Sequence, residues 1–279
     1  MATIRRLMEA AEAKLLAAGI DEAAAHAELI AARALGKSRT YARAFGQLEA
    51  GAKEEALFNK ILAQRLDGRP LAYILGEAEF MGRVLKVSPA VLIPRPETEE
   101  LTEQAAKKLQ MPPRRVLDLC AGSGCIAVSL ALLFDGARVV AADISPAALD
   151  IARQNAQNLR AAARMEFIET DLFANISGTF DLIISNPPYI AAGDIAALAP
   201  DVRHEPRLAL DGGPDGLRVL ERIAKDGPAY LNAGGLLALE TGCGQAEKVV
   251  KFFKDTIWQK PQIGRDISGT GRFIFAKRK

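Results

Sequence analysis

Hydrophobic residues near the start of the chain recur with the period of an α-helix. The pattern predicts a first helix over Ile4–Leu16 and a later one over Ala52–Leu66. Between them, Asp21 is placed to cap a helix that ends at Gly36. Many alanines favour close packing of these helices. We therefore predict a small helical bundle over residues 1–75, which serves either to dock a partner or as plain scaffold.

Residues 76–97 have a different pattern and predict a linker. Short strands are indicated within Glu79–Val87, with a turn near Gly82. A helix is expected to start at Thr98 or a neighbouring residue. We therefore expect a β-hairpin linker with an active-site segment over residues 76–97, followed by one larger domain over residues 98–279.

From Arg115 onward, short apolar runs alternate with helical patterns. The predicted strands are Val116–Cys120, Val139–Ile144, Met165–Glu169, Leu182–Ser185, Leu236–Glu240, Gln262–Ile267 and Arg272–Ala276. The predicted helices are Gly124–Phe134, Pro146–Leu159, Leu217–Tyr230 and Ala246–Phe253. Ser145 is a good cap before Pro146 at the first helical position. This order predicts an α/β fold with a doubly wound, mostly parallel seven-stranded sheet whose last two strands pair antiparallel.

Composition narrows the class of protein. The 279 residues are 49% hydrophobic and 25% charged, which is typical of a soluble globular protein. A net charge of +2 gives no support for a broad nucleic-acid-binding face, so no direct nucleic-acid binding is expected. The three cysteines have no metal-ligand spacing, so we predict no metal site and a reducing compartment. No apolar run is long enough for a membrane span, and no apolar signal core follows the first residues, so a cytoplasmic location is expected.

Asn186-Pro187-Pro188-Tyr189 directly follows a predicted buried strand. It should therefore lie at the carboxyl edge of the sheet, where open α/β folds bind their ligands. Asn186 offers an amide that accepts and donates, Pro187 keeps Asn186 extended, and Tyr189 adds an aromatic face. Acceptors that are fixed beside an aromatic wall can hold a planar NH2 group. A rigid turn after a strand is the structural alternative, and the complete tetrapeptide favours the site.

The segment from Asp118 to Gly124 closes one predicted strand and opens a helix. Its glycines allow a tight turn and a close ligand, and Asp143 ends the next strand, where an acid can hold ribose hydroxyls. This loop alone fits either NAD or S-adenosylmethionine. Two acids favour S-adenosylmethionine: Asp118 could meet its ammonium group, and Asp171 could reach its adenine amino group.

Together these segments resemble the class I S-adenosylmethionine-dependent methyltransferases, and among them the HemK/PrmC family of peptide chain release factor glutamine N5-methyltransferases. The resemblance covers essentially the whole chain and is most specific at Ile93–Glu99. Asp201–Pro206 and Leu239–Gly242 follow in family order. The resemblance implies S-adenosylmethionine as cofactor, with S-adenosylhomocysteine as product. The residues implied to bind it are Asp118, Cys120, Ala121, Gly122, Ser123, Gly124, Asp143, Asp171, Leu172 and Asn186.

One departure from the family pattern is Cys120, where many members have glycine. Its side chain narrows the turn slightly, and we expect cofactor binding to survive. Leu172 occupies a position that the family often fills with a bulkier group beside adenine, so Leu172 is expected to contact it by packing.

The resemblance implies methyl transfer to the side-chain amide nitrogen of the glutamine in the Gly-Gly-Gln loop of class I release factors. Asn186 and the carbonyl of Pro187 would each accept one N–H and so aim the nitrogen lone pair at the methyl group. Pro188 and Tyr189 would border the substrate. The segment with Arg95, Glu97 and Thr98 would close the pocket and Arg203 with Glu205 would line its rim, or these five would form a structural ion-pair and capping network.

Two other functions fit parts of the pattern. A nucleic-acid adenine N6-methyltransferase would grip the same kind of NH2 group, but it would have to extract a base from its stack, and the chain shows no clear basic groove for that. An adaptor that binds release factors or ribosomes without catalysis would not require the intact loop, acid and Asn186.

Overall fold

The computed structural model describes residues 2–279, which divide into two compact units. The first, which we call the helical unit, holds the residues up to Gly76 together with Pro200–His204. The second, which we call the sheet unit, holds Glu77–Ala199 and Glu205–Lys279. The segment Pro200–His204 thus belongs with the helices although residues of the sheet unit precede and follow it in sequence.

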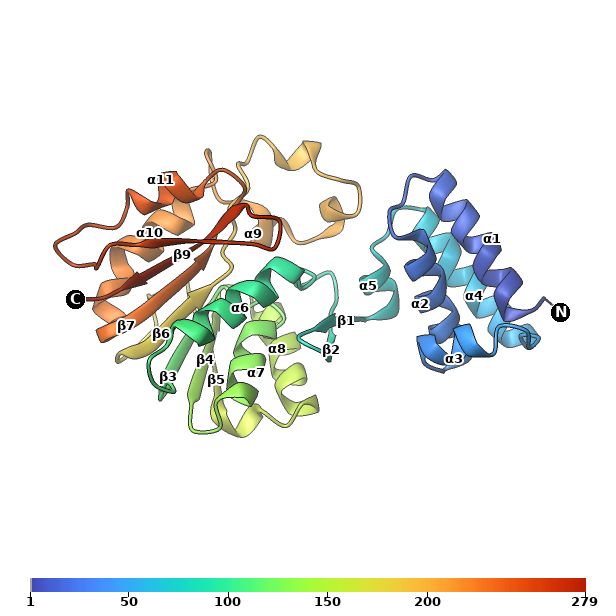
Figure 1. Ribbon diagram of the computed structural model, residues 1–279, viewed down its shortest axis with the longest axis horizontal. Coiled ribbons are helices and arrows are strands. Elements are labelled where there is room, and N and C mark those ends of the chain that lie inside the picture. The colour runs from blue at the N-terminus through green and yellow to red at the C-terminus, as the bar shows by residue number, and fades with distance from the viewer. Residues whose placement is uncertain (1) are drawn as a thin grey trace. The chain divides into compact units, whose positions relative to one another are not determined.

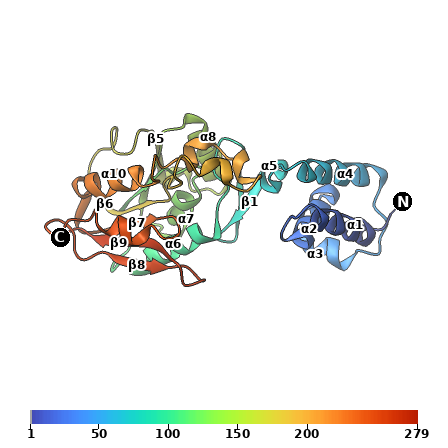
Figure 2. The same cartoon turned by 90° about the horizontal axis from the view of Figure 1, so that it is seen from above.

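The helical unit is built from short helices that pack through alanine-rich faces, as the sequence predicts (Figure 2). They are α1 (Ile4–Ala17), α2 (Ala23–Leu35), α3 (Arg39–Ala44), α4 (Ala52–Leu66) and α5 (Leu71–Leu75). Thr3 and Ser38 cap α1 and α3 by accepting a backbone N–H. The predicted cap at Asp21 is wrong, because α2 is preceded by Glu22 in a left-handed conformation with no side-chain cap. The short helices α3 and α5 have too few residues to show a helical period, and the sequence did not predict them.

The sheet unit contains the predicted seven-stranded sheet, in the order β5-β4-β3-β6-β7-β9-β8. Its strands are β3 (Arg115–Leu119), β4 (Arg138–Asp143), β5 (Met165–Glu169), β6 (Phe180–Ser185), β7 (Leu231–Glu240), β8 (Gln262–Arg265) and β9 (Gly271–Lys277). The first five strands in that order pair parallel, and β9 pairs antiparallel with β7 and β8. After β5 the chain returns to the other side of β3, so the gap between β3 and β6 is the switch point of the sheet.

Helices cover both faces of this sheet, as expected for a doubly wound fold (Figure 1). On one face lie α6 (Pro96–Lys108), α7 (Cys125–Leu133) and α8 (Pro146–Asn158); on the other lie α10 (Arg218–Asp226) and α11 (Ala246–Val250). Neighbouring strand residues face opposite layers: Val116 packs under the first group and Leu117 under the second. Both are fully buried. The fold class predicted from the sequence is confirmed.

Some helices begin or end at other residues than the sequence predicts, and the residues at those ends give the reason. The helix expected to start near Thr98 begins at Pro96, whose ring fixes the backbone angle that the first helical turn needs. The predicted cap Ser145 is confirmed: its Oγ accepts the N–H of Ala148. The helix predicted to reach Tyr230 ends at Asp226, and a 3-10 turn that contains a proline follows. Another short helix, α9 (Arg207–Leu210), was not predicted.

The predicted hairpin consists of β1 (Glu77–Phe80) and β2 (Arg83–Lys86), with its turn at Met81 and Gly82. Asn155 of α8 fastens this hairpin to the loop that follows β3. Its Oδ1 accepts the N–H of Lys86, and its Nδ2 donates to the carbonyls of Lys86 and Ser123. The hairpin and the predicted cofactor loop are therefore held by one buried amide.

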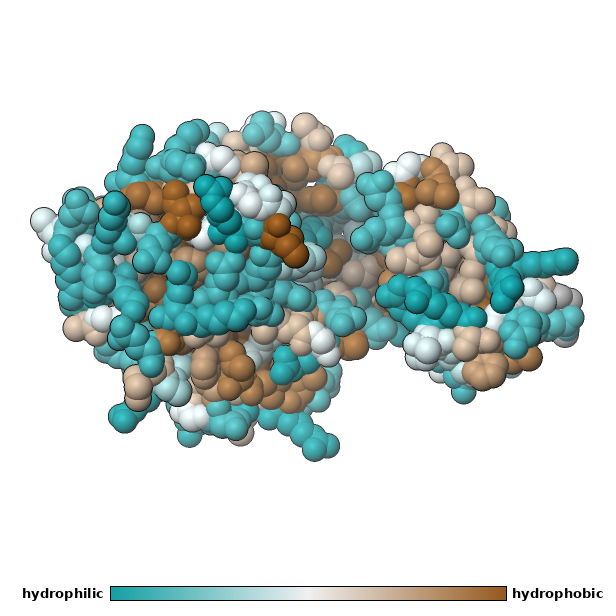
Figure 3. All heavy atoms as spheres, in the orientation of Figure 1, coloured by the Kyte–Doolittle hydropathy of each residue, from teal (hydrophilic) through white to brown (hydrophobic). Residues whose placement is uncertain are grey.

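Hydrophilic side chains cover most of the visible face of the sheet unit, and its hydrophobic side chains lie in small separate groups (Figure 3). Among the helices of residues 2–279, none combines the length and the hydrophobicity that crossing a lipid bilayer requires.

Candidate active site

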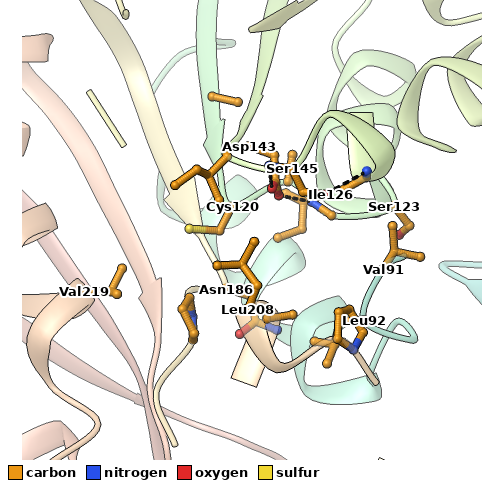
Figure 4. Close-up of a pocket in the computed structure, with 18 of the residues that line it drawn as sticks. Val91, Leu92, Cys120, Ser123, Ile126, Asp143, Ser145, Asn186, Leu208 and Val219 are labelled. Atoms are coloured by element: carbon orange, nitrogen blue, oxygen red, sulfur yellow. Dashed lines mark hydrogen bonds between the residues drawn. The ribbon is translucent and has the colours of Figure 1, made fainter. Parts of the chain in front are cut away.

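A cavity of about 430 Å³ lies at the switch point, where β3, β4 and β6 end (Figure 4). That volume is within the range of small-molecule sites. Of the site residues predicted from the sequence, those that line it are Arg95, Thr98, Cys120, Ala121, Gly122, Ser123, Asp143, Asp171, Leu172, Asn186 and Pro188. Glu97, Asp118, Gly124, Pro187, Tyr189, Arg203 and Glu205 are not part of its lining.

The loop after β3 turns sharply so that α7 can start beneath the cavity. Cys120 has a left-handed backbone, with φ of 59°, which explains why glycine suits this position. Burial raises the pKa of the Cys120 thiol far above its usual range, so it stays protonated. Gly124 serves packing, because a Cβ there would come within 2.9 Å of the Cβ of Ala152 on α8.

The carboxylate of Asp143 organises this loop from the end of β4. Its Oδ2 accepts the N–H of Gly122 at 2.8 Å, and its Oδ1 accepts the N–H of Ser145 at 2.9 Å (Figure 4). Burial raises the pKa of Asp143, and these N–H donors oppose that shift. The group is thus held rigidly at the cavity wall, with lone pairs left for hydroxyl donors.

Asp118 lies behind the cavity wall rather than in it. Its side chain is fully buried, and Oδ2 accepts the N–H of Ala127 in the first turn of α7. Its Oδ1 has no hydrogen-bond partner among residues 2–279. Burial raises the pKa of Asp118 well above its usual value. Contact between Asp118 and a ligand's ammonium group remains a prediction.

Asp171 and Leu172 follow β5 at the side of the cavity. Asp171 forms a two-pronged ion pair with Arg222 of α10, at 2.9 and 3.0 Å. The sequence did not predict this partner, because α10 follows about fifty residues later. Leu172 is buried with a left-handed backbone and presents an apolar surface to the cavity.

The side chain of Asn186 at the end of β6 belongs to a hydrogen-bonded chain. Asn186 Nδ2 donates to Thr98 Oγ1 at 2.9 Å, and Thr98 Oγ1 donates to Glu240 Oε2 at 2.7 Å. The hydroxyl of Tyr189 donates to Glu240 Oε1 at 3.2 Å. The oxygen of the Asn186 amide is the atom left to accept from a ligand. Tyr189 is not part of the cavity lining and packs, partly buried, against the hydrophobic core cluster that includes Leu119 and Leu239. Its role as an aromatic wall for the substrate stays a prediction.

Glu240, the acid of this hydrogen-bonded network, is almost fully buried, with 1% of its surface exposed. Burial raises its pKa to about 7, although the hydroxyls of Thr98 and Tyr189 favour the ionised form. Burial and the neighbouring Glu240 carboxylate also raise the pKa of Tyr189 beyond its usual range, so its hydroxyl keeps its proton. The network therefore titrates through Glu240.

The backbone after Asn186 is clamped by a glycine-rich loop. Ile190 N donates to Leu210 O and Gly212 N donates to Ile190 O, which makes a short parallel bridge. At Gly216 a Cβ would lie 2.2 Å from the carbonyl oxygen of Tyr189, so no side chain fits there. Gln245 Nε2 donates to the same carbonyl at 2.9 Å. These contacts fix the direction of the Asn-Pro-Pro-Tyr segment.

Arg95 and Glu205 form an ion pair at the edge of the cavity, and Glu205 Oε2 accepts the N–H of Ile93 at 3.0 Å. Arg95 also lines the cavity. Arg95 thus takes part in an ion pair, as the structural interpretation expects, while a role of this segment in closing the pocket stays a prediction. Arg203 belongs to the segment Pro200–His204 of the helical unit.

Among residues 2–279, no three His, Cys, Asp or Glu side chains gather closely enough to hold a metal ion.

Sequence reasoning missed Glu240 as part of the site, although it named the Leu239–Gly242 segment. An acid directly after a fully apolar strand end is an available signal. The partners of Glu240 could not be found that way, because Thr98 lies 142 residues away in sequence. Asn155, Gln245 and Arg222 were missed for the same reason.

Two protein-family models match this chain. A model described as the PrmC N-terminal domain matches residues 6–76, and one described as the methyltransferase small domain matches residues 98–205.

Solved structures of low sequence identity share the fold. A methyltransferase from Pyrococcus furiosus aligns with a TM-score of 0.55 and 18% identity, over 79% of this chain and 98% of that one. The T. thermophilus 16S rRNA N2 G1207 methyltransferase, solved with AdoMet and guanosine, aligns with a TM-score of 0.51 and 21% identity, over 73% of this chain and 50% of that one. At these identities the likeness concerns the fold alone.

Curated relatives match at nearly full length, and each is named release factor glutamine methyltransferase. The protein of Nitratidesulfovibrio vulgaris is 38% identical over 99% of this chain and 96% of its own. That of Geobacter sulfurreducens is 40% identical over 98% and 95%, and that of Cereibacter sphaeroides is 41% identical over 97% and 96%. At this identity and coverage, the chain belongs to the release factor glutamine methyltransferase family.

Proposed function

We propose that this protein transfers a methyl group from S-adenosylmethionine to the side-chain amide nitrogen of the glutamine in the Gly-Gly-Gln loop of a class I release factor. The observation that carries the proposal is the amide of Asn186, which lines the cavity with its nitrogen engaged by Thr98 and its oxygen left to accept. Such an acceptor suits a substrate NH2 group. The full-length relatives favour glutamine over adenine as the group that carries this NH2.

The residues around the cavity fit S-adenosylmethionine. Asp143 offers a carboxylate at the wall for ribose hydroxyls, and Leu172 offers a buried apolar surface for adenine. Asp171 keeps lone pairs beyond its pairing with Arg222 and can accept from the adenine amino group. Asp118 behind the wall supplies negative charge when ionised. When bound, the cofactor supplies an electrophilic methyl group on a sulfonium centre.

The nitrogen of a glutamine amide is a poor nucleophile, because its lone pair is delocalised into the carbonyl. Asn186 Oδ1 and the carbonyl of Pro187 would each accept one of its hydrogens. Held in this way, the nitrogen directs its remaining lone pair into the cavity. The rate enhancement then comes from positioning and from fixed dipoles. The nitrogen carries a positive charge once it is methylated and is then a strong acid, so one of its hydrogens leaves as a proton to an acceptor oxygen or to water, and no side chain has to act as a strong base.

The helical unit is proposed to dock the release factor. The proposed boundaries remain residues 1–75 for this domain, 76–97 for the linker and 98–279 for the methyltransferase domain. We keep the cytoplasm as the proposed location, since Cys120, Cys125 and Cys243 all have free thiols.

The test offers a purified class I release factor and, separately, duplex DNA to the protein with labelled S-adenosylmethionine. Peptide mass spectrometry should find one added methyl group on the glutamine of the Gly-Gly-Gln loop, and the DNA should stay unlabelled. Label on adenine with an unmodified glutamine would reject the proposal.

A further inference from the structure

The hydrogen-bonded chain behind Asn186 has a direction that can be worked out by counting protons. The Thr98 hydroxyl has one hydrogen, and it donates that hydrogen to Glu240 Oε2. An ionised carboxylate only accepts, so it fixes this donation. Thr98 Oγ1 must then accept from Asn186, and the amide can meet it only with its NH2 group. The amide oxygen is consequently turned the other way.

We infer that Thr98 and Glu240 are positioning residues, and that they hold the Asn186 amide with its oxygen toward the substrate NH2. This inference rests on the proposed function, because the orientation matters only if the substrate presents N–H groups at Asn186. The chain joins residues from α6, β7 and the end of β6, so a fixed orientation depends on the tertiary fold rather than on local sequence. Both supporting side chains are almost fully buried, with Thr98 2% and Glu240 1% exposed, so water does not compete for these bonds.

Protonation of Glu240 at Oε2 would reverse the direction of donation in the hydrogen bonds from Glu240 through Thr98 to Asn186. The carboxyl would then donate to Thr98, and Thr98 could donate to the Asn186 oxygen. The amide would turn its NH2 group to the substrate, where two sets of donors face each other and cannot bond. An ionised Glu240 therefore keeps the site competent.

The charged and titratable groups around Glu240 set its pKa, and so the pH at which these hydrogen bonds reverse. Its pKa is raised to about 7, mainly by burial and with a smaller contribution from Glu97 on α6, while the hydrogen bonds from Thr98 and Tyr189 and the charge of Arg272 on β9 oppose the rise. Tyr189 donates a hydrogen bond and stays protonated. Cys125 at the start of α7 also senses the Glu240 charge, and its own pKa is raised to about 12 mainly by burial, so it stays neutral.

The first test compares two substitutions on α6. Thr98→Val removes the hydroxyl and keeps the shape. Thr102→Val is the matched control: Thr102 is also fully buried, lies one turn later, and donates to the backbone carbonyl of Thr98. With a release factor and S-adenosylmethionine, Thr98→Val should lower kcat/KM by on the order of 10- to 100-fold. Thr102→Val should stay within about twofold of wild type. Thr98→Ser, which restores the hydroxyl, should recover most of the lost rate.

The second test measures how the rate depends on pH, and its first part needs only the wild type. The kcat/KM of the wild type should fall about tenfold per pH unit below about pH 7, because the competent form requires ionised Glu240. Glu240→Gln cannot ionise, so its profile should lack this limb. Thr98→Val should lack it as well, since Glu240 no longer reaches Asn186. Calorimetric affinity for S-adenosylmethionine should stay within about twofold in both variants if they act on the amide alone.

Failure of the inference and failure of the proposed function give different results. A wild type that leaves glutamine unmodified at every pH rejects the function itself. An active wild type with equal rates for Thr98→Val and Thr102→Val rejects the positioning role. Retention of the acid limb in Glu240→Gln also rejects it, because another group would then be responsible for the pH dependence.

Discussion

Glu240→Gln should change how the stability of the protein depends on pH. A carboxylic acid that is buried is stabilised in its neutral form, and here burial raises the pKa of Glu240 from 4.5 to about 7. Glutamine has nearly the same shape but no charge. It can still accept from Thr98 and offer its NH2 group to the oxygen of Tyr189, so the packing around β7 should be kept.

The direction in which stability changes with pH follows from proton binding. Between the unfolded pKa and the folded pKa, the native state holds a proton on Glu240 that the unfolded state has lost, so native stability falls as pH rises through this window. For a pKa that rises from 4.5 to about 7, the contribution of Glu240 is about 2.5 kcal/mol more favourable at about pH 5 than at about pH 8. Above the folded pKa the contribution no longer changes. The difference in unfolding free energy between Glu240→Gln and wild type should therefore move in favour of the variant by about 2.5 kcal/mol across this range.

The assay is urea unfolding of both proteins across the pH range, followed by circular dichroism. Taking the difference between the two proteins removes the effect of other groups whose pKa is shifted by burial, such as Asp118 and Asp143. Glu166→Gln, at an exposed position of β5, is the matched control for the substitution itself. A difference for Glu240→Gln that stays constant with pH would refute the assignment of a buried, titrating carboxyl to Glu240.

Three further outcomes follow from the structure and the proposal. In urea unfolding, Gly216→Ala should lower the unfolding free energy by about 2–4 kcal/mol, because a left-handed backbone and a 2.2 Å approach to Tyr189 O both oppose a Cβ. Gly244 has the same left-handed backbone but lies in open space, so Gly244→Ala should lower it by only about 1 kcal/mol. Equal losses in the two variants would contradict the clamp at Gly216. Asp143→Ala should weaken S-adenosylmethionine binding by on the order of 1–3 kcal/mol in calorimetry while the protein stays folded, and wild-type affinity would contradict its assignment to the ribose. Removal of the first 75 residues should raise KM for an intact release factor and leave cofactor affinity unchanged; unchanged kinetics in a folded, truncated protein would reject a docking role.

Much of the fold was predictable because its signals are local. Apolar runs that alternate with helical patterns identified the parallel sheet, and the site was placed at its carboxyl edge because Asp143 ends one strand and Asn186 directly follows another. A parallel strand can be recognised without its neighbours, because it is buried on both faces and its residues are therefore nearly all apolar. The start of α6 was misplaced because Thr98 is a good capping residue type, whereas Pro96 determines the first turn.

The polar contacts of the site were less predictable. The hydrogen bond from the hydroxyl of Tyr189 to Glu240 was not expected, because the two residues lie 51 positions apart. Glu240, Thr98 and Asn186 come from three elements that meet only in the folded protein. Nothing in the local sequence of each element records the hydrogen bond it makes with the others, so the direction of the Asn186 amide emerges only from the assembled structure.

The central claim is that the Asn186 amide oxygen holds the substrate NH2 group during methyl transfer. The most direct measurement is mass spectrometry of a release factor after incubation with S-adenosylmethionine and either wild type or Asn186→Ala, with cofactor affinity measured by calorimetry in parallel. The wild type should methylate the glutamine of the Gly-Gly-Gln loop, and the variant should lose on the order of 100-fold or more in rate while it still binds the cofactor. A variant that methylates this glutamine at the wild-type rate would contradict the claim.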